Sequence, residues 1–265
     1  MLTITWPRVL KALSQVVRQY GVSPELFRTV QDRLPKLLEV CGPASQTNRV
    51  AIRIGETLLR GDHRIVVPTC PDYSHERGRY NFQCVRGGMS LLLRRHIPFI
   101  ERVVEVLPDA KILIMIADQE ANDEALCRAT HVGRETFLVN VRRSVISTKL
   151  AFASRGLPWE VALMTEVIPN LTTREEQLAE WIAQEERFAR HITSDTYARR
   201  GMYTRMRLRG SQLRTTRTIQ TAAQYVALGK VAEENGWLIV NHTTTNLAWY
   251  LKTRVGFLHN PVRVY

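Results

Sequence analysis

Residues 64–80 read RIVVPTCPDYSHERGRY, an apolar run that changes abruptly into reactive and hydrogen-bonding side chains. The β-branched residues 65–67 are typical of a strand covered on both faces in a parallel sheet. Pro68 has no N–H to donate to a sheet, so we expect the strand to end there. Pro68 and Pro71 together predict a stiff, extended turn just past the carboxyl end of this strand.

The loop that follows this strand is the first candidate site. In open α/β sheets, ligands bind outside the carboxyl ends of the strands. The loop offers thiol and hydroxyl nucleophiles, an imidazole and other polar groups within seven positions, namely Thr69, Cys70, Asp72, Tyr73, Ser74 and His75. The alternative interpretation is an ordinary strand-to-helix connection in which these polar side chains only cap the turn.

Four further segments predict strands, at 111–117, 159–168, 237–241 and 262–265, and helical patterns separate them. This alternation is typical of a Rossmann-like parallel sheet. We therefore predict an α/β fold in which about five parallel strands are flanked by helices. We expect a single domain over residues 1–265, with a helical front layer at 1–60 and the sheet with its helices at 61–265.

Local signals predict where the main helices begin and end. In the front layer we expect two helices broken at Gly21, the second of them capped by Ser23 before Pro24. Thr172 and Glu175 have the spacing of a capping box. The expected helices are two within 3–40, one at 48–59, one at 134–154, one at 172–191 and one at 218–235, which Gly236 ends and which carries Tyr225.

A second group of polar residues follows the strand at 111–117. Asp118, Glu120 and Asp123 form an acidic patch in a basic chain, for which we expect a cationic ligand: a guanidinium, an amine or a metal ion. The alternative for Asp123 is capping of the next helix. Other candidates for binding substrate are Glu166, which should share a strand face with Glu160, and Asn241 and His242 after the strand at 237–241.

The charge balance points to a polyanionic partner. The formal net charge is +12 and the isoelectric point is about 10.0. Residues 197–231 contain no acid. The guanidinium fork suits phosphate oxygens, so we predict an RNA-binding surface made of Arg94, Arg95, Arg199, Arg200, Arg205, Arg207, Arg209, Arg214 and Arg217. The alternatives are a solvated basic face or a site for one small phosphorylated ligand.

Composition and motifs exclude several classes. No apolar run approaches the roughly 20 residues that span a bilayer, and the first residues do not read as a secretory signal, so we expect a cytoplasmic protein. The cysteines, at 41, 70, 84 and 127, lack zinc-site spacing, and we expect reduced thiols. Neither G-x-G-x-x-G nor a P-loop occurs, which argues against a nucleotide cofactor. We predict no cofactor and no bound metal.

The stretches VVPTCPDYSH and ILIMIADQE, combined with the basic charge and the missing nucleotide motif, resemble tRNA-dependent cyclodipeptide synthases, in particular their arginine-using branch. That family is Rossmann-like and is related to class I aminoacyl-tRNA synthetases. The resemblance implies that two charged tRNAs are used and that the first aminoacyl group passes to an enzyme side chain. It implies a cyclic dipeptide as the product and arginyl-tRNA as a partner, with no role for a membrane or for DNA.

The family's motifs match this chain in part. Where the better-known branch has a nucleophilic serine, this chain has Cys70 before Pro71, and Ser74 lies four residues on. The family's helical tyrosine corresponds to Tyr225, but the glutamate expected four residues later is Gly229. The nucleophile is thus Cys70 or Ser74, and the candidates for moving protons are His75, His242 and Glu166.

Two other functions remain open. One is an isonitrile synthase-like enzyme, which acts on a free amino acid and needs no large basic surface. The other is a non-catalytic RNA-binding protein, in which the polar loop residues are only structural. An aminoacyl ester is already activated, so the transfer reaction itself needs a nucleophile, a base and oxyanion donors but no ATP.

Overall fold

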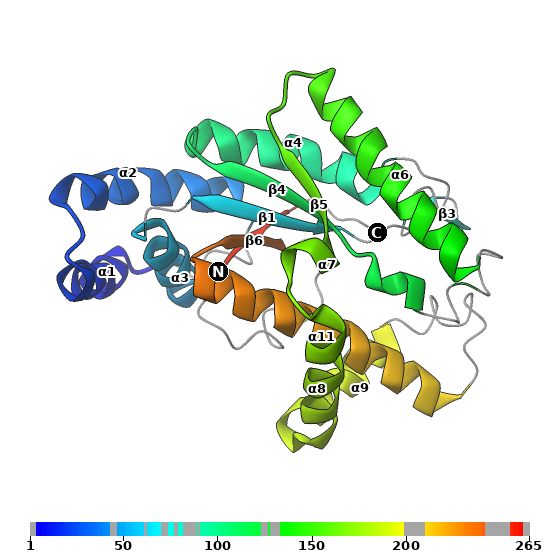
Figure 1. Ribbon diagram of the computed structural model, residues 1–265. Helices are drawn as coiled ribbons and strands as arrows, with labels where there is room; N and C mark the ends of the chain where they lie inside the picture. Colours follow the sequence, from blue (N-terminus) through cyan, green and yellow to red (C-terminus); the bar gives the residue numbers. More distant parts are fainter. Residues whose placement is uncertain are drawn as a thin grey trace.

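The computed structural model describes residues 4–42, 47–60, 63–69, 74–76, 79–81, 89, 91–122, 127, 133–198, 210–241 and 255–261. Within these ranges, the side chains at 74–76, 79–81, 91, 92, 95, 120, 121, 187, 195, 198 and 241 are not described. The chain forms an α/β fold around one five-stranded parallel sheet flanked by helices, as the alternation of apolar segments predicts (Figure 1).

The described helices and strands follow one another along the chain in this order: α1 (Trp6–Tyr20), α2 (Pro24–Val40), α3 (Asn48–Leu58), β1 (Arg64–Thr69), β2 (Ser74–Glu76), β3 (Arg79–Asn81), α4 (Leu91–Val106), β4 (Lys111–Ile116), η3 (Gln119–Asn122), α6 (Arg134–Ala153), β5 (Glu160–Leu163), α7 (Met164–Val167), α8 (Leu171–Gln184), α9 (Glu186–Ala198), α11 (Ser211–Asn235), β6 (Leu238–Asn241) and β7 (Gly256–His259). The short strands β2 and β3 pair with each other as an antiparallel ribbon.

The five strands of the main sheet lie in the order β5-β4-β1-β6-β7, and every pair is parallel. Strand β1 is central. It pairs with β4 along its whole length, from Arg64 to Thr69, but with β6 only through Ile65 and Val66. Pro68 has no N–H to donate, which weakens the ladder on the β6 side beyond this point. Contrary to our expectation, the strand itself continues to Thr69.

Helices cover both faces of the sheet (Figure 1). On one face, Ile65 and Val67 of β1 join the core formed with α1, α2, α3, α4 and α6. On the other face, Val66 joins the core formed with α8, α9 and α11. All three side chains are fully buried, and each burial stabilises the fold by roughly 1.5–3 kcal/mol. The uninterrupted apolar run thus reflects a strand covered on both sides, as predicted.

The front helices begin and end at the predicted signals. Ser23 caps α2, since its hydroxyl accepts a hydrogen bond from the Leu26 N–H at 3.1 Å, and Pro24 occupies the first turn. Helix α1 ends at Gly21, whose φ of 62° is in the left-handed region that favours glycine. Helix α11 ends in the same way at Gly236, with a φ of 66°.

The structure corrects the prediction for the third strand. We expected a strand over 159–168, but β5 ends at Leu163 and the chain turns at once into α7. The N–H of Leu163 donates to the Glu166 carboxylate at 2.9 Å, and this local bond ends the strand. Glu160 and Glu166 therefore do not share a strand face. The Glu160 carboxylate instead forms an ion pair with Arg64, with 3.6 Å between Oε1 and the guanidinium nitrogen.

The prediction of one helix over 172–191 was also wrong. Two helices, α8 and α9, meet at Glu185, whose backbone is extended with φ −84° and ψ 102°. The expected capping box does not form: Asn170 precedes the helix in a left-handed conformation and makes no side-chain cap bond. Thr172 and Glu175 bond to other parts of the chain, as described below.

The fifth strand is β7 at Gly256–His259, a strand that we did not predict. The strand expected at 262–265 lies outside the described residues. Within the part of the chain that the structure describes, every helix is too short or too polar to cross a membrane.

Candidate functional site

The order of the strands indicates where a sheet of this kind binds a ligand, beside the central strand. From β1 the chain moves outward in one direction through β4 and β5, and then returns to the opposite side of β1 through β6 and β7. In open α/β sheets, ligands bind where the strand order reverses in this way. The reversal lies between β1 and β6, whose pairing stops at Val66 and Ile239. The carboxyl ends of these two strands, at Thr69 and Asn241, therefore flank the candidate site.

The backbone at the end of β1 is fixed by its other neighbour, β4. The Ala117 N–H donates to the Thr69 carbonyl at 3.0 Å, which extends the ladder by one residue beyond the end of β4. Thr69 itself is buried. Along the chain, Cys70 follows Thr69 and Asp118 follows Ala117. Cys70 lies outside the described residues.

The carboxylate of Asp118 has internal partners. It is 6% exposed and accepts hydrogen bonds from the Thr165 N–H, at 3.1 Å, and from the Thr165 hydroxyl. Thr165 lies in the first turn of α7, where backbone N–H groups lack helical partners. Asp118 thus caps α7 from the neighbouring strand. The cationic ligand expected at Asp118 stays a prediction. The side chain of Glu120 and the whole of Asp123 lie outside the part of the chain that the structure describes.

Beside Asp118, a chain of side-chain hydrogen bonds joins three helices. Arg134 at the start of α6 donates to Asn122 at 3.0 Å, Asn122 donates to Gln119 at 2.7 Å, and Gln119 donates to Thr172 of α8 at 3.0 Å. Gln119 is 6% exposed, so the centre of this relay is buried. The relay holds the carboxyl edge of β4 to α6 and α8. Sequence reasoning missed it because the bond from Gln119 to Thr172 crosses 53 residues.

Glu166 and Tyr225 lie on the helices that cover the α11 side of the sheet. The exposed Glu166 carboxylate accepts from the Leu163 N–H, so one of its oxygens is used within α7. Tyr225 is 8% exposed and packs against Phe257 of β7 inside the interface between α11 and the sheet. Its neighbour Gln224 donates to Glu175 of α8 at 3.2 Å. The catalytic role expected of Tyr225 therefore concerns a largely buried side chain.

Two histidines that we did not single out lie near the end of β7. His259, the last residue of β7, pairs in register with Asn241, and burial lowers the pKa of its imidazole. His96 of α4 is fully buried, and its Nδ1 lies 2.8 Å from the Nδ2 of Asn260, which is 2% exposed. Neither histidine belongs to a recognisable sequence motif. For His96, the contact with Asn260 joins positions 164 residues apart.

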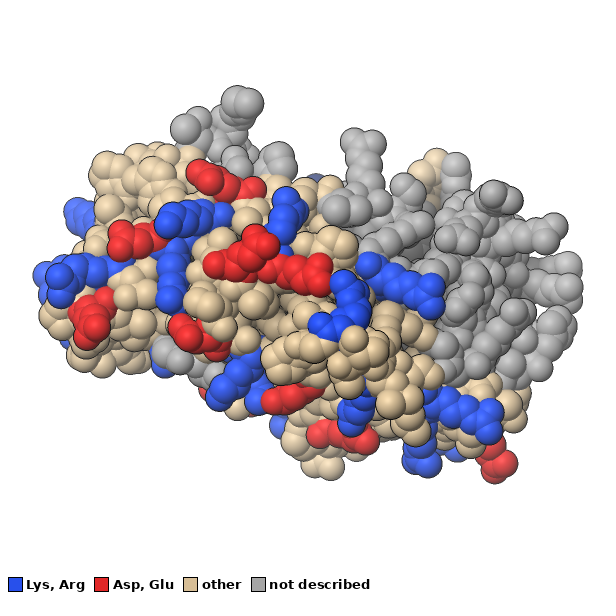
Figure 2. Space-filling view, turned by 90° about the horizontal axis from the view of Figure 1, so that it is seen from above, with Lys and Arg blue, Asp and Glu red and all other residues tan. Residues whose placement is uncertain are grey.

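The predicted RNA-binding arginines are described only in part. Arg94 is exposed on α4, and Arg214 is half-buried on α11. Arg217 is 8% exposed, so most of its side chain lies inside the fold, and its role in RNA binding stays a prediction. On the face that Figure 2 shows, basic and acidic side chains are interspersed over the described atoms. The remaining predicted arginines, together with Asp72, Tyr73 and His242, lie outside the described side chains, as do the side chains of Ser74, His75, Arg95 and Asn241.

Neither a search for metal-binding clusters nor comparison with known proteins assigns a function to this site. Among the described residues, no three His, Cys, Asp or Glu side chains gather closely enough to hold a metal ion. Comparison of the chain with protein-family models, with curated proteins and with solved structures gave no match.

Proposed function

We propose that this chain is an aminoacyltransferase of the cyclodipeptide synthase type, which joins aminoacyl groups from two charged tRNAs into a cyclic dipeptide that contains arginine. The observation that carries the proposal is the position of Thr69, at the carboxyl end of the central strand and beside the reversal of strand order. Cys70 follows it immediately in the sequence, before Pro71. A nucleophile at this position has access to the crevice where α/β sheets bind their ligands.

In the proposed reaction, the sulfur of Cys70 or the hydroxyl oxygen of Ser74 attacks the ester carbon of the first aminoacyl-tRNA. The bond from that carbon to the ribose oxygen breaks, and the tRNA leaves with a protonated hydroxyl. The amine of a second aminoacyl-tRNA then attacks the acyl-enzyme, which frees the nucleophile. Finally, the remaining amine of the dipeptidyl-tRNA attacks its own ester, closes the ring and releases the second tRNA. Each step uses an ester or thioester already present, so no ATP is consumed.

The charge of the chain supports a tRNA substrate over a free amino acid. A formal charge of +12 attracts a polyanion, and the arginine-rich segment at 199–217 contributes much of the excess. Backbone N–H groups in the loop after Thr69 would hold the oxyanion of each tetrahedral intermediate. His75 and His242 are the proposed proton carriers.

A non-catalytic RNA-binding protein is the second candidate, and one specific observation favours it. Two carboxylates expected to bind substrate have internal roles, since Asp118 caps α7 and Glu166 bonds to the Leu163 N–H. Polar residues that serve only to hold loops are what this alternative requires.

The deciding experiment incubates the purified protein with tRNA charged with each amino acid in turn and in pairs, and analyses the products by mass spectrometry. The proposal expects a cyclic dipeptide that depends on arginyl-tRNA, and expects none from free arginine with ATP. Intact-protein mass spectrometry of a briefly incubated sample should show a covalent arginyl adduct. Tight RNA binding without consumption of any charged tRNA would support the binding protein instead.

Variants identify the nucleophile. Cys70→Ala or Ser74→Ala, whichever removes the nucleophile, should abolish both the adduct and the product while RNA affinity is kept. Cys127→Ala is the matched control, since it removes a thiol from outside the proposed site. If both loop variants keep full turnover, the proposed acyl-enzyme is wrong.

A further inference from the structure

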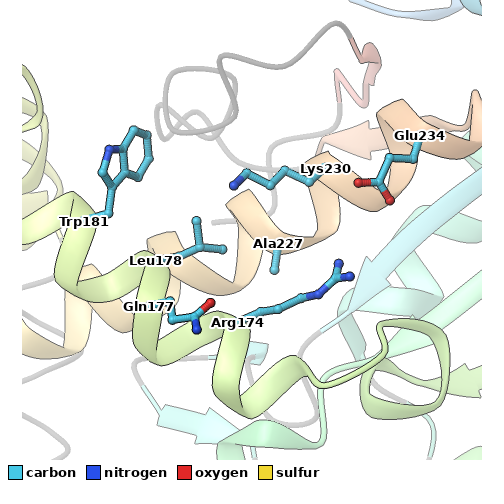
Figure 3. Close-up of a pocket in the computed structure, with 7 residues that line it drawn as sticks. All are labelled: Arg174, Gln177, Leu178, Trp181, Ala227, Lys230 and Glu234. Atoms are coloured by element: carbon cyan, nitrogen blue, oxygen red, sulfur yellow. The ribbon is translucent and has the colours of Figure 1, made fainter.

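Helices α8 and α11 enclose a groove of about 490 Å³ that belongs to neither the sheet edge nor the loop after β1. Figure 3 shows its lining: Arg174, Gln177, Leu178 and Trp181 from α8, and Ala227, Lys230 and Glu234 from α11. The volume is within the range of small-molecule sites, about 300–1,000 Å³. The lining combines three apolar residues with four charged or polar ones.

One end and the floor of the groove are apolar and held in place. Trp181 packs edge-on against Phe188 of α9, with the ring centres 5.1 Å apart and the planes at 73°. This contact fixes the position of the indole before any ligand arrives. Leu178 and Ala227 are 8% and 0% exposed and form the floor between the two helices. A flat aromatic or aliphatic group therefore meets a preformed surface here.

The charged side chains in the groove do not form ion pairs with one another. Arg174, Lys230 and Glu234 make no ion pair within 4.0 Å of any described residue. The Lys230 ammonium points into the groove toward Trp181, and the Arg174 side chain extends along the α11 side toward Glu234 (Figure 3). Two cations and one carboxylate give a net charge of +1, which one negative charge on a ligand would balance.

We propose that this groove binds a small aromatic monocarboxylate. The carboxylate would bond to Lys230 and Arg174, and the ring would pack on Trp181 and Leu178. Glu234 disfavours ligands with more than one negative charge by direct repulsion. Glu176 and Glu180 are exposed on the same helix α8, which disfavours a nucleic acid strand as the occupant.

The test uses phenylacetate as the probe on the full-length protein labelled with ¹⁵N. Titration should shift the indole N–H signal of Trp181, assigned as the signal that is missing in Trp181→Phe, with saturation in the millimolar range. Phenylacetamide, which is neutral, and phenyl phosphate, which carries a second charge, should bind at least about fivefold more weakly. Trp181→Phe serves only to assign the signal, and the comparison of ligands itself uses the parent protein alone.

Variants then test the charges. Lys230→Gln and Arg174→Gln should each weaken phenylacetate binding about fivefold to tenfold. Glu234→Gln should keep phenylacetate binding and improve the binding of phenyl phosphate. Lys149→Gln, an exposed lysine of α6, is the matched control and should change nothing. Phenylacetate that does not saturate, equal binding of the neutral amide, or unchanged affinity in both charge variants would overturn the proposal.

Discussion

The carboxylate of Asp118 at the end of β4 accepts two hydrogen bonds from Thr165, one from its backbone N–H at 3.1 Å and one from its hydroxyl. The two residues are 47 positions apart, and their contact joins the carboxyl edge of the sheet to the first turn of α7. A buried carboxylate that accepts two bonds is costly to remove, because its donors lose their partner and water does not easily replace it.

Replacement of Asp118 by alanine should therefore destabilise the protein by about 2 kcal/mol. Thr165→Val removes only the hydroxyl donor and should cost about 1 kcal/mol. Urea unfolding followed by circular dichroism measures both. Asp109→Ala is the matched control, because Asp109 is exposed and its ion pair with Arg33 at 3.4 Å should contribute less than about 1 kcal/mol. Equal losses for Asp118→Ala and Asp109→Ala would contradict the capping role.

The free energy of unfolding should fall in mild acid because His259 is protonated more readily in the unfolded chain. Because burial lowers the pKa of this imidazole in the folded state, the unfolded chain takes up the proton first. The contribution of His259 is therefore fully present above about pH 6.5, the unfolded value, and is lost as the pH falls from there toward the lower folded pKa. His259→Gln should lose less stability than the parent protein between pH 7.5 and pH 5.5 in urea unfolding. His191→Gln on α9 controls for the loss of a histidine, and a parallel pH dependence in all three proteins would refute this prediction.

Gly256 should tolerate no side chain. A Cβ at this position would lie 2.9 Å from the Ile54 Cα and 3.2 Å from the Arg53 carbonyl oxygen, so the backbone of α3 would have to move away from β7. Gly256→Ala should destabilise by about 1–3 kcal/mol, as overpacking does. At Gly133 a Cβ would meet nothing within 4 Å, and φ is −67°, so Gly133→Ala should cost only a few tenths of a kcal/mol, about the value of an N-cap change. Thermal unfolding of the two variants compares them directly.

Two arginines of the predicted RNA-binding set should behave differently. Arg94 is exposed, and Arg94→Gln should weaken RNA binding and reduce its salt dependence with no change in stability. Arg217 is 8% exposed, and Arg217→Gln should lower the melting temperature. At a temperature where the variant is folded, its affinity for RNA should stay the same. Filter binding at several salt concentrations and thermal unfolding separate the two effects. An affinity loss in Arg217→Gln alone, at full stability, would reverse this assignment.

Much of the architecture could be predicted from local patterns. Continuous apolar runs identified β1, β4 and β6, because a strand buried on both faces must be apolar at every position. Capping residues and glycines placed the ends of α1 and α2, because these signals act within one turn of the chain. The position of the candidate site at the carboxyl edge follows from the same strands, once their parallel order is known.

One error lies where a bond between distant residues competed with a local signal. Thr172 and Glu175 have the spacing of a capping box. Their side chains instead accept hydrogen bonds from Gln119 and Gln224, respectively. The strand after Trp159 ends at Leu163 because its N–H bonds to Glu166, a short contact that strand periodicity does not report. The last strand, β7, is only four residues long and carries a weak pattern.

The sequence by itself determined the class of fold, the central strand and the chemistry available in the loop after it, because these depend on residue type and short spacing. Only the tertiary structure decided which side chains are already engaged. Asp118 caps α7, Arg217 is buried, and His96 meets Asn260 across the fold. Such roles depend on which segments pack together, and packing joins residues whose separation along the chain leaves no local pattern.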